Sequence, residues 1–114
     1  AAMIAHQQNA TIIYTGVCQT DFSGYPDCRE DFIQAQQQTI NLAMENDLQI
    51  KTPLMHLTKA ETVIEMNQLG RLDWYAHTHT CYEGTQPACG QCPACKLRLN
   101  GFLEANIVDP LPYK

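Results

Sequence analysis

The chain has 114 residues, of which 45% are hydrophobic, which allows a packed core and argues against wholesale disorder. Twelve acidic residues against seven basic ones give a formal net charge of −5, which excludes a general electrostatic attraction to nucleic acid or to an anionic membrane. No apolar run is long enough to span a bilayer and no signal peptide is recognisable, so we expect no membrane partner.

The first predicted elements are a helix over residues 1–8 and a short strand over residues 11–15. The strand is β-branched and does not alternate between apolar and polar residues, which predicts burial on both faces, as in a parallel sheet. A second helix is predicted over residues 30–45. One stripe of this helix consists of Ile33, Gln37, Ile40 and Met44.

A second short strand is predicted over residues 48–51, followed by a capping box that opens a helix at residues 58–61. Gly70 ends that helix in the left-handed position. The predicted apolar side of the helix consists of Val63, Ile64, Met66 and Leu69.

The last predicted helix runs from Pro93 to about Ala105, and the Pro-rich tail over residues 109–112 cannot continue it. Its predicted apolar face consists of Leu99, Phe102 and Leu103. The order of elements predicts a βαβ unit of an α/β fold. Ligands of open parallel sheets bind beyond the carboxyl ends of the strands, so the loop over residues 17–29 is a candidate ligand site.

Four of the six cysteines fall within fifteen positions: Cys81, Cys89, Cys92 and Cys95. Two overlapping Cys-x-x-Cys steps with a further cysteine one loop upstream predict a tetrahedral structural zinc site. Gly84, Pro87 and Gly90 suit the turns between these ligands, and Pro93 suits a helix start. A thiolate at Cys95 would lie in the first turn of that helix, where free N–H groups favour negative charge.

Three other interpretations of the cysteines remain open. Disulfides or ordinary buried thiols could use the same residues, and an iron–sulfur cluster also uses Cys-x-x-Cys runs. His77 or His79 could replace one sulfur ligand, although four thiolates already fill the coordination sphere. Clustered cysteines without a secretory signal indicate a cytoplasmic setting, in which Cys18 and Cys28 are free thiols.

The loop over residues 16–29 gathers carboxylates, hydroxyls, an aromatic ring and an arginine, which together suit a flat, hydrogen-bonding heterocycle. The candidate substrate-binding residues are Asp21, Ser23, Tyr25, Asp27 and Arg29. Local structure offers an alternative for each of them: for example, Asp27 could cap the next helix and Asp21 could form an Asx-turn. No catalytic residue is assigned.

Five stretches closely resemble the 7-cyano-7-deazaguanine synthase (ExsB) family. They are Gly-Val-Cys-Gln-Thr-Asp-Phe-Ser-Gly-Tyr-Pro-Asp-Cys-Arg at 16–29, Thr-Pro-Leu-Met at 52–55, Lys-Ala-Glu-Thr at 59–62, Thr-Cys-Tyr at 80–82 and Cys-Gly-Gln-Cys-Pro-Ala-Cys at 89–95. The resemblance covers nearly the whole chain and corresponds to the carboxyl-terminal half of the family.

The resemblance implies an α/β fold: the carboxyl-terminal part of a Rossmann-like domain of the adenine nucleotide alpha hydrolase (ATP pyrophosphatase) type, over residues 1–75. A small four-cysteine zinc-binding appendage and terminal helix would occupy residues 76–114. It also implies an ATP-dependent C–N ligase of queuosine biosynthesis, a transfer RNA modification pathway. Its substrates would be 7-carboxy-7-deazaguanine, ammonia and ATP with Mg²⁺, and a homodimer is compatible with it.

Two departures from the family pattern matter. The Ser-Gly-Gly-x-Asp-Ser phosphate loop is absent and the chain opens without methionine, so we expect a fragment that is inactive alone. Residues 76–79 are also unusual for the family.

The alternative function is a free-standing zinc-binding interaction module, for which nucleic acid is a poor partner because only Lys96 and Arg98 are basic near the cysteines.

Overall fold

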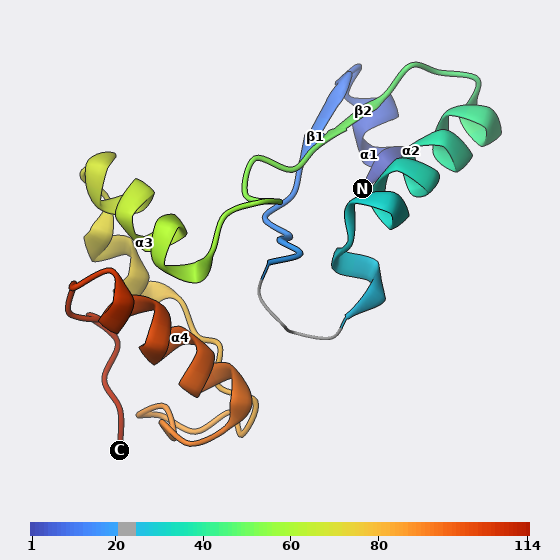
Figure 1. Ribbon diagram of the computed structural model, residues 1–114. Helices are drawn as coiled ribbons and strands as arrows, with labels where there is room; N and C mark the ends of the chain where they lie inside the picture. The colour runs from blue at the N-terminus through green and yellow to red at the C-terminus, as the bar shows by residue number, and fades with distance from the viewer. Residues whose placement is uncertain (21–24) are drawn as a thin grey trace. The chain divides into compact units, whose positions relative to one another are not determined.

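The computed structural model describes residues 1–20 and 25–114. Its elements are α1 (Ala2–Gln7), β1 (Ile12–Tyr14), the 3₁₀ helix η1 (Pro26–Cys28), α2 (Glu30–Met44), β2 (Gln49–Lys51), α3 (Lys59–Gln68), the 3₁₀ helix η2 (Leu72–His77) and α4 (Pro93–Glu104) (Figure 1). The chain forms two compact units, residues 1–56 and residues 57–114. The domain division at residue 75 stays a prediction.

The first unit is a βαβ arrangement, which confirms the predicted α/β class. Strands β1 and β2 pair in parallel with Ile13 opposite Ile50, and α2 connects them (Figure 1). The carboxyl ends of both strands therefore meet at one edge of the sheet. The segment that follows β1, which contains the candidate substrate loop, starts from that edge.

The predicted stripe of α2 is confirmed, because all four of its members are half-buried. Apart from Glu30 and Asn41, which are also half-buried, the other residues of the helix are exposed. Two polar side chains fix the helix against β2. The Gln37 Oε1 accepts from the Ile50 N–H at 2.7 Å. The Asn41 amide pairs with both the N–H and the C=O of Leu48 at 3.0 Å. These bonds satisfy backbone groups that would otherwise lie unpaired in a partly buried position.

The prediction that the first strand is buried on both faces is wrong for this chain. Ile12 is 41% exposed and Tyr14 is 70% exposed. Burial of a parallel strand needs a layer over each face of the sheet. The described residues form only two strands, with α1 in contact with β1 and α2 in contact with β2, and that is too little structure to cover both faces.

The second unit opens with the predicted capping box. The Glu61 N–H donates to Thr58 Oγ1 at 3.2 Å, and the Thr58 N–H donates to Glu61 Oε2 at 2.7 Å. The bond from the Thr58 N–H is the main cause that lowers the pKa of Glu61, and the Thr58 hydroxyl, which donates to the same carboxylate oxygen at 3.0 Å, lowers it further. Gly70 follows the helix at φ +65°, as predicted.

The predicted apolar side of α3 is only partly correct. Val63 is fully buried and Met66 is half-buried, but Ile64 and Leu69 are exposed. Within residues 57–114, α3 packs against α4 and η2, so one narrow side of it is covered. The 3₁₀ helix η2 was not predicted. None of the helices in the described part of the chain has both the length and the apolarity to cross a membrane.

Replacing Thr58 by Ala is expected to destabilise the second unit by about 1 kcal/mol, because the first turn of α3 loses its side-chain cap. The Glu61 carboxylate would keep only one of its two bonds to residue 58. Urea unfolding of the single variant measures the loss. Glu65→Ala, an exposed change one turn further along α3, is the control and should change the free energy of unfolding by less than about 0.5 kcal/mol.

Gly101 marks a close approach of α4 to α3. A Cβ at this position would lie 2.7 Å from the Lys59 Cβ and 3.3 Å from the Lys59 carbonyl carbon. We therefore expect Gly101→Ala to cost about 1–3 kcal/mol through overpacking, although alanine is the better helix former. Asn100→Ala, at an exposed neighbouring position, should be neutral or stabilising. Equal melting temperatures of the two variants would contradict this close packing.

Candidate metal centre

The four predicted cysteines meet at one point. The Sγ atoms of Cys81, Cys89, Cys92 and Cys95 all lie within 4.8 Å of one another. Four sulfurs around one ion at 2.3 Å would be about 3.8 Å apart, and the Cys89 and Cys95 sulfurs are 3.9 Å apart. None of the six cysteines forms a disulfide, so the disulfide interpretation is wrong. The group could hold a metal ion.

Local backbone geometry brings the sulfurs together as the sequence predicts. Gly84 and Gly90 have φ values of +63° and +69°, a conformation that glycine adopts without strain. Pro93 begins α4, where its missing N–H is not needed. The loop before the first Cys-x-x-Cys step thereby returns Cys81 to the other three ligands.

Backbone N–H groups point at three of the sulfurs. Cys89 N–H donates to Cys81 Sγ at 3.4 Å, and Cys92 N–H donates to Cys89 Sγ at 3.3 Å. Gln91 N–H also donates to Cys89 Sγ, and Cys95 N–H donates to Cys92 Sγ, both at 3.4 Å. Such bonds favour the thiolate, which is the form that binds metal.

The thiols are electrostatically unequal. The Cys89 N–H is the main cause that lowers the pKa of Cys81 to about 5, and the Cys95 N–H likewise lowers the pKa of Cys92. Burial raises the pKa of Cys95 to about 12. The expectation that the helix terminus favours a thiolate at Cys95 is therefore wrong. Cys92 is the N-cap of α4, so its sulfur receives the helix N–H instead.

The cysteines sit in an apolar cluster with Ala88 and Leu111, and the partly buried Tyr113 packs against it. Leu111 and Tyr113 come from the tail after α4, which Figure 1 shows running back towards the loop with the cysteines. Ala88 and Tyr113 form a parallel β-bridge. From the sequence, this tail is predicted only to be non-helical.

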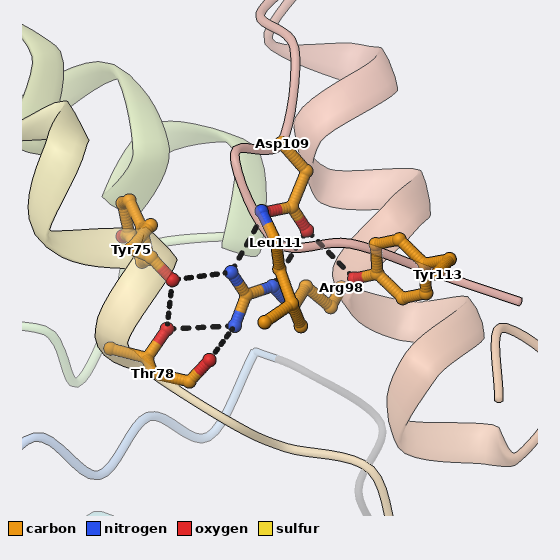
Figure 2. Close-up of polar contacts among 6 residues, drawn as sticks. All are labelled: Tyr75, Thr78, Arg98, Asp109, Leu111 and Tyr113. Atoms are coloured by element: carbon orange, nitrogen blue, oxygen red, sulfur yellow. Dashed lines mark hydrogen bonds and ion pairs between the residues drawn. The ribbon is translucent and has the colours of Figure 1, made fainter. Parts of the chain in front are cut away.

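Arg98 is the buried charge of this unit, at 5% exposure. Its Nε and Nη2 donate to the two carboxylate oxygens of Asp109, each at 2.7 Å. Its Nη1 donates to Thr78 Oγ1 at 2.7 Å, and Nη2 also donates to the Tyr75 carbonyl at 3.0 Å (Figure 2). The guanidinium thereby joins η2, α4 and the tail, with the Tyr75 and Phe102 rings about it.

Asp109 accepts two further bonds, from the Leu111 N–H at 2.9 Å and from the Tyr113 hydroxyl at 2.7 Å (Figure 2). Burial alone would raise the pKa of Asp109, but the bonds from Arg98, Leu111 and Tyr113 lower it below its ordinary value. The ionised carboxylate therefore stabilises the fold at neutral pH. This contribution disappears as the pH falls from the ordinary aspartate range through the lowered pKa.

Sequence reasoning missed this network, although one signal was available. Cys95, Arg98 and Phe102 recur at three- and four-residue spacing, so they share one face of α4. An arginine on the face that carries a metal ligand is a candidate for burial. The predicted apolar face of α4 is correct for Phe102 and wrong for Leu103, which is 77% exposed.

The histidines upstream of Cys81 are not members of the cysteine group. Among the described residues, the metal-capable set contains the four cysteines alone. His79 Nε2 lies 3.1 Å from the Thr85 carbonyl oxygen and His77 is exposed. This favours their interpretation as bystanders.

The structure describes three of the five candidate substrate-binding residues. Tyr25, Asp27 and Arg29 lie in and beside η1, and all three are exposed. Asp21 and Ser23 lie outside the described residues. Asp27 forms no side-chain cap on α2. A substrate role for these residues stays a prediction.

A cluster that was not predicted lies beside this segment. The Gln19 N–H donates to the Met55 carbonyl at 3.0 Å, and Gln19 Oε1 accepts from the Glu30 N–H at 3.2 Å. The His56 ring lies 3.5 Å from both the Gln19 amide and the Glu30 carboxylate. Gln19 thus ties the segment after β1 to the segment after β2 and to the start of α2.

Comparison with known proteins identifies the relatives of this chain. A family model described as "Queuosine biosynthesis protein QueC" matches residues 1–106. A 7-cyano-7-deazaguanine synthase from Chromobacterium violaceum is 49% identical over 111 residues, which are 97% of this chain and 47% of the relative. The synthases of Laribacter hongkongensis and Staphylococcus haemolyticus are 50% and 52% identical, over 97% and 92% of this chain and 48% and 49% of theirs. The chain spans about half the length of these relatives.

Proposed function

The chain belongs to the QueC family of queuosine biosynthesis proteins, and from this membership we propose that it is part of a 7-cyano-7-deazaguanine synthase. The observation that carries the proposal is the near-complete match of the chain to curated synthases at about half identity. It favours the enzyme over the free-standing interaction module.

The proposed reaction is an ATP-dependent C–N ligation. ATP with Mg²⁺ activates the carboxylate of 7-carboxy-7-deazaguanine as an adenylate and releases pyrophosphate. Ammonia displaces AMP and gives the amide. A second adenylation of the amide oxygen, followed by loss of AMP and protons, gives the nitrile. The chain contains no Ser-Gly-Gly-x-Asp-Ser phosphate loop, so we propose that residues 1–114 alone are inactive.

We propose that the four cysteines hold one structural zinc ion. Four thiolates leave no open coordination position, which is typical of structural rather than catalytic zinc. The short distances among the sulfurs support a single ion, because a cluster of several irons needs room between its ligands. Bound zinc would neutralise part of the thiolate charge and hold the loop over residues 81–92 against α4.

The proposed substrate site lies in the first unit, within a Rossmann-like domain that the rest of the full-length protein completes. The loop over residues 16–29 follows a parallel strand at its carboxyl end, where open α/β sheets bind their ligands. Tyr25, Asp27 and Arg29 are exposed, so a heterocycle can reach them. We propose a cytoplasmic setting, in which the cysteine thiols stay reduced.

Incubation of the full-length, zinc-loaded protein with ATP, Mg²⁺, ammonium and 7-carboxy-7-deazaguanine tests the function. Mass spectrometry should detect 7-cyano-7-deazaguanine together with AMP and pyrophosphate, and leaving out ammonium should abolish the product. Residues 1–114 expressed alone should give none. Absence of product from folded, metal-loaded full-length protein would overturn the proposal.

A further inference from the structure

We propose that residues 109–114, here called the tail clasp, close over the four-cysteine site and control how fast its metal exchanges. The family model matches residues 1–106, so the tail clasp lies beyond the matched region. The inference rests on the proposed metal site and is independent of the ligase reaction.

The tail clasp packs against the cysteine ligands and against the loop that carries them. Leu111 is 9% exposed and belongs to the apolar cluster that contains Cys81, Cys92 and Cys95. The Tyr113 ring covers Gly90, because a Cβ on Gly90 would lie 3.6 Å from the Tyr113 Cδ1. Gly90 lies between two of the cysteine ligands.

Backbone bonds hold the clasp against the residue before Cys89. The Ala88 N–H donates to the Pro112 carbonyl at 3.1 Å, and the Lys114 N–H donates to the Ala88 carbonyl at 2.9 Å. Ala88 is itself buried, so these two backbone groups depend on the clasp for their partners. Opening the clasp would leave them to water.

Asp109 anchors the clasp to the helix that carries Cys95. Its carboxylate accepts from Arg98, which lies three residues after Cys95 on α4, and from Leu111 and Tyr113 within the clasp (Figure 2). One buried carboxylate thus fixes the clasp to α4 and also sets its internal turn. The clasp is attached at both the helix side and the loop side of the site.

A metal ion leaves four thiolates one ligand at a time, as each thiolate is protonated or is replaced by a donor atom of an incoming chelator. Both routes require access to the sulfurs. Cys81, Cys92 and Cys95 are buried and form one apolar cluster with Leu111, whereas Cys89 is only half-buried. A chelator can therefore reach Cys89 first, but release of the metal needs access to the three buried sulfurs. That access requires the clasp to open locally, and the free energy of the opening sets the exchange rate. Weaker docking of the clasp increases the fraction of molecules in which the clasp is open, and the rate of metal exchange rises in proportion.

The test uses zinc-loaded full-length protein and follows zinc transfer to the chromogenic chelator 4-(2-pyridylazo)resorcinol. Two variants weaken the clasp and keep the Arg98–Asp109 pair: a stop codon after Pro110, and Leu111→Ala. The matched control is Leu103→Ala, the same substitution at an exposed position of α4. We expect both clasp variants to release zinc at least about tenfold faster than the wild type and the control to release it at the wild-type rate.

A second readout separates access from coordination. In metal-free protein, peptide mass spectrometry should show faster alkylation of Cys92 and Cys95 by N-ethylmaleimide in the clasp variants. If every variant binds a full complement of zinc and releases it at the wild-type rate, the clasp proposal is wrong and the proposed metal site is unaffected. A wild type that binds no zinc would overturn both. Where the truncation abolishes helical circular dichroism, the comparison of Leu111→Ala with Leu103→Ala decides.

Discussion

Replacing Cys92 by Ser in the full-length protein is expected to remove the metal and to unfold the region around residues 80–105. Cys92 belongs to both Cys-x-x-Cys steps, caps α4 and accepts the Cys95 N–H. A structural zinc contributes on the order of 10 kcal/mol to folding, which is comparable with the whole stability of a domain. Zinc should fall from about one per chain to near zero by elemental analysis.

Hydrogen exchange with mass spectrometry locates the damage. Protection should disappear in η2, in the cysteine loop and in α4, while β1 and β2 keep theirs, because they belong to the other compact unit. The matched control is Cys28→Ser, a half-buried free thiol in η1 that should retain zinc and protection. Wild-type zinc content and an unchanged melting profile in Cys92→Ser would contradict a structural metal.

Replacing Arg98 by Met is expected to destabilise the second unit by about 3–5 kcal/mol. Methionine can keep the apolar contacts with the Tyr75 and Phe102 rings, but it donates no hydrogen bond. Asp109 would then stay buried without its cation, and the Thr78 oxygens would lose their donor. Urea unfolding monitored by the exchange of α4 amides measures this loss.

Two further variants show that the effect comes from the ion pair. Lys96→Met also replaces a cationic side chain by methionine, at an exposed position of α4, and should change stability by less than about 0.5 kcal/mol. Adding Asp109→Leu to Arg98→Met should recover part of the loss, because it removes the unpaired carboxylate. Recovery should be incomplete, since Leu111 and Tyr113 also donate to that carboxylate. Equal stability of Arg98→Met and Lys96→Met would exclude an energetic role for the pair.

Local signals in the sequence predicted most elements and the metal site. The capping box at Thr58, the left-handed glycines and Pro93 act through bonds or dihedral limits within a few residues, so their outcome depends little on the rest of the fold. The cysteine spacing is local in the same sense. The structure confirmed the local structural predictions and the meeting of the four cysteines, whereas a metal ion at that point stays a prediction.

What sequence reasoning missed depends on contacts between distant segments. The burial of Arg98 was not predicted because its partner Asp109 lies eleven residues away, in a tail without periodicity. Leu103 looked buried because apolar spacing does not reveal which side of a helix finds a neighbour. The exposure of Tyr14 likewise depends on which layers cover the sheet, and the residues of the strand do not encode that.

X-ray absorption at the zinc edge of the purified full-length protein is the most direct test of the metal assignment. One closed-shell ion held by Cys81, Cys89, Cys92 and Cys95 should give a single shell of four sulfurs at about 2.3 Å. A first shell with nitrogen or oxygen ligands, or a protein that carries iron with labile sulfide in place of zinc, would contradict the account.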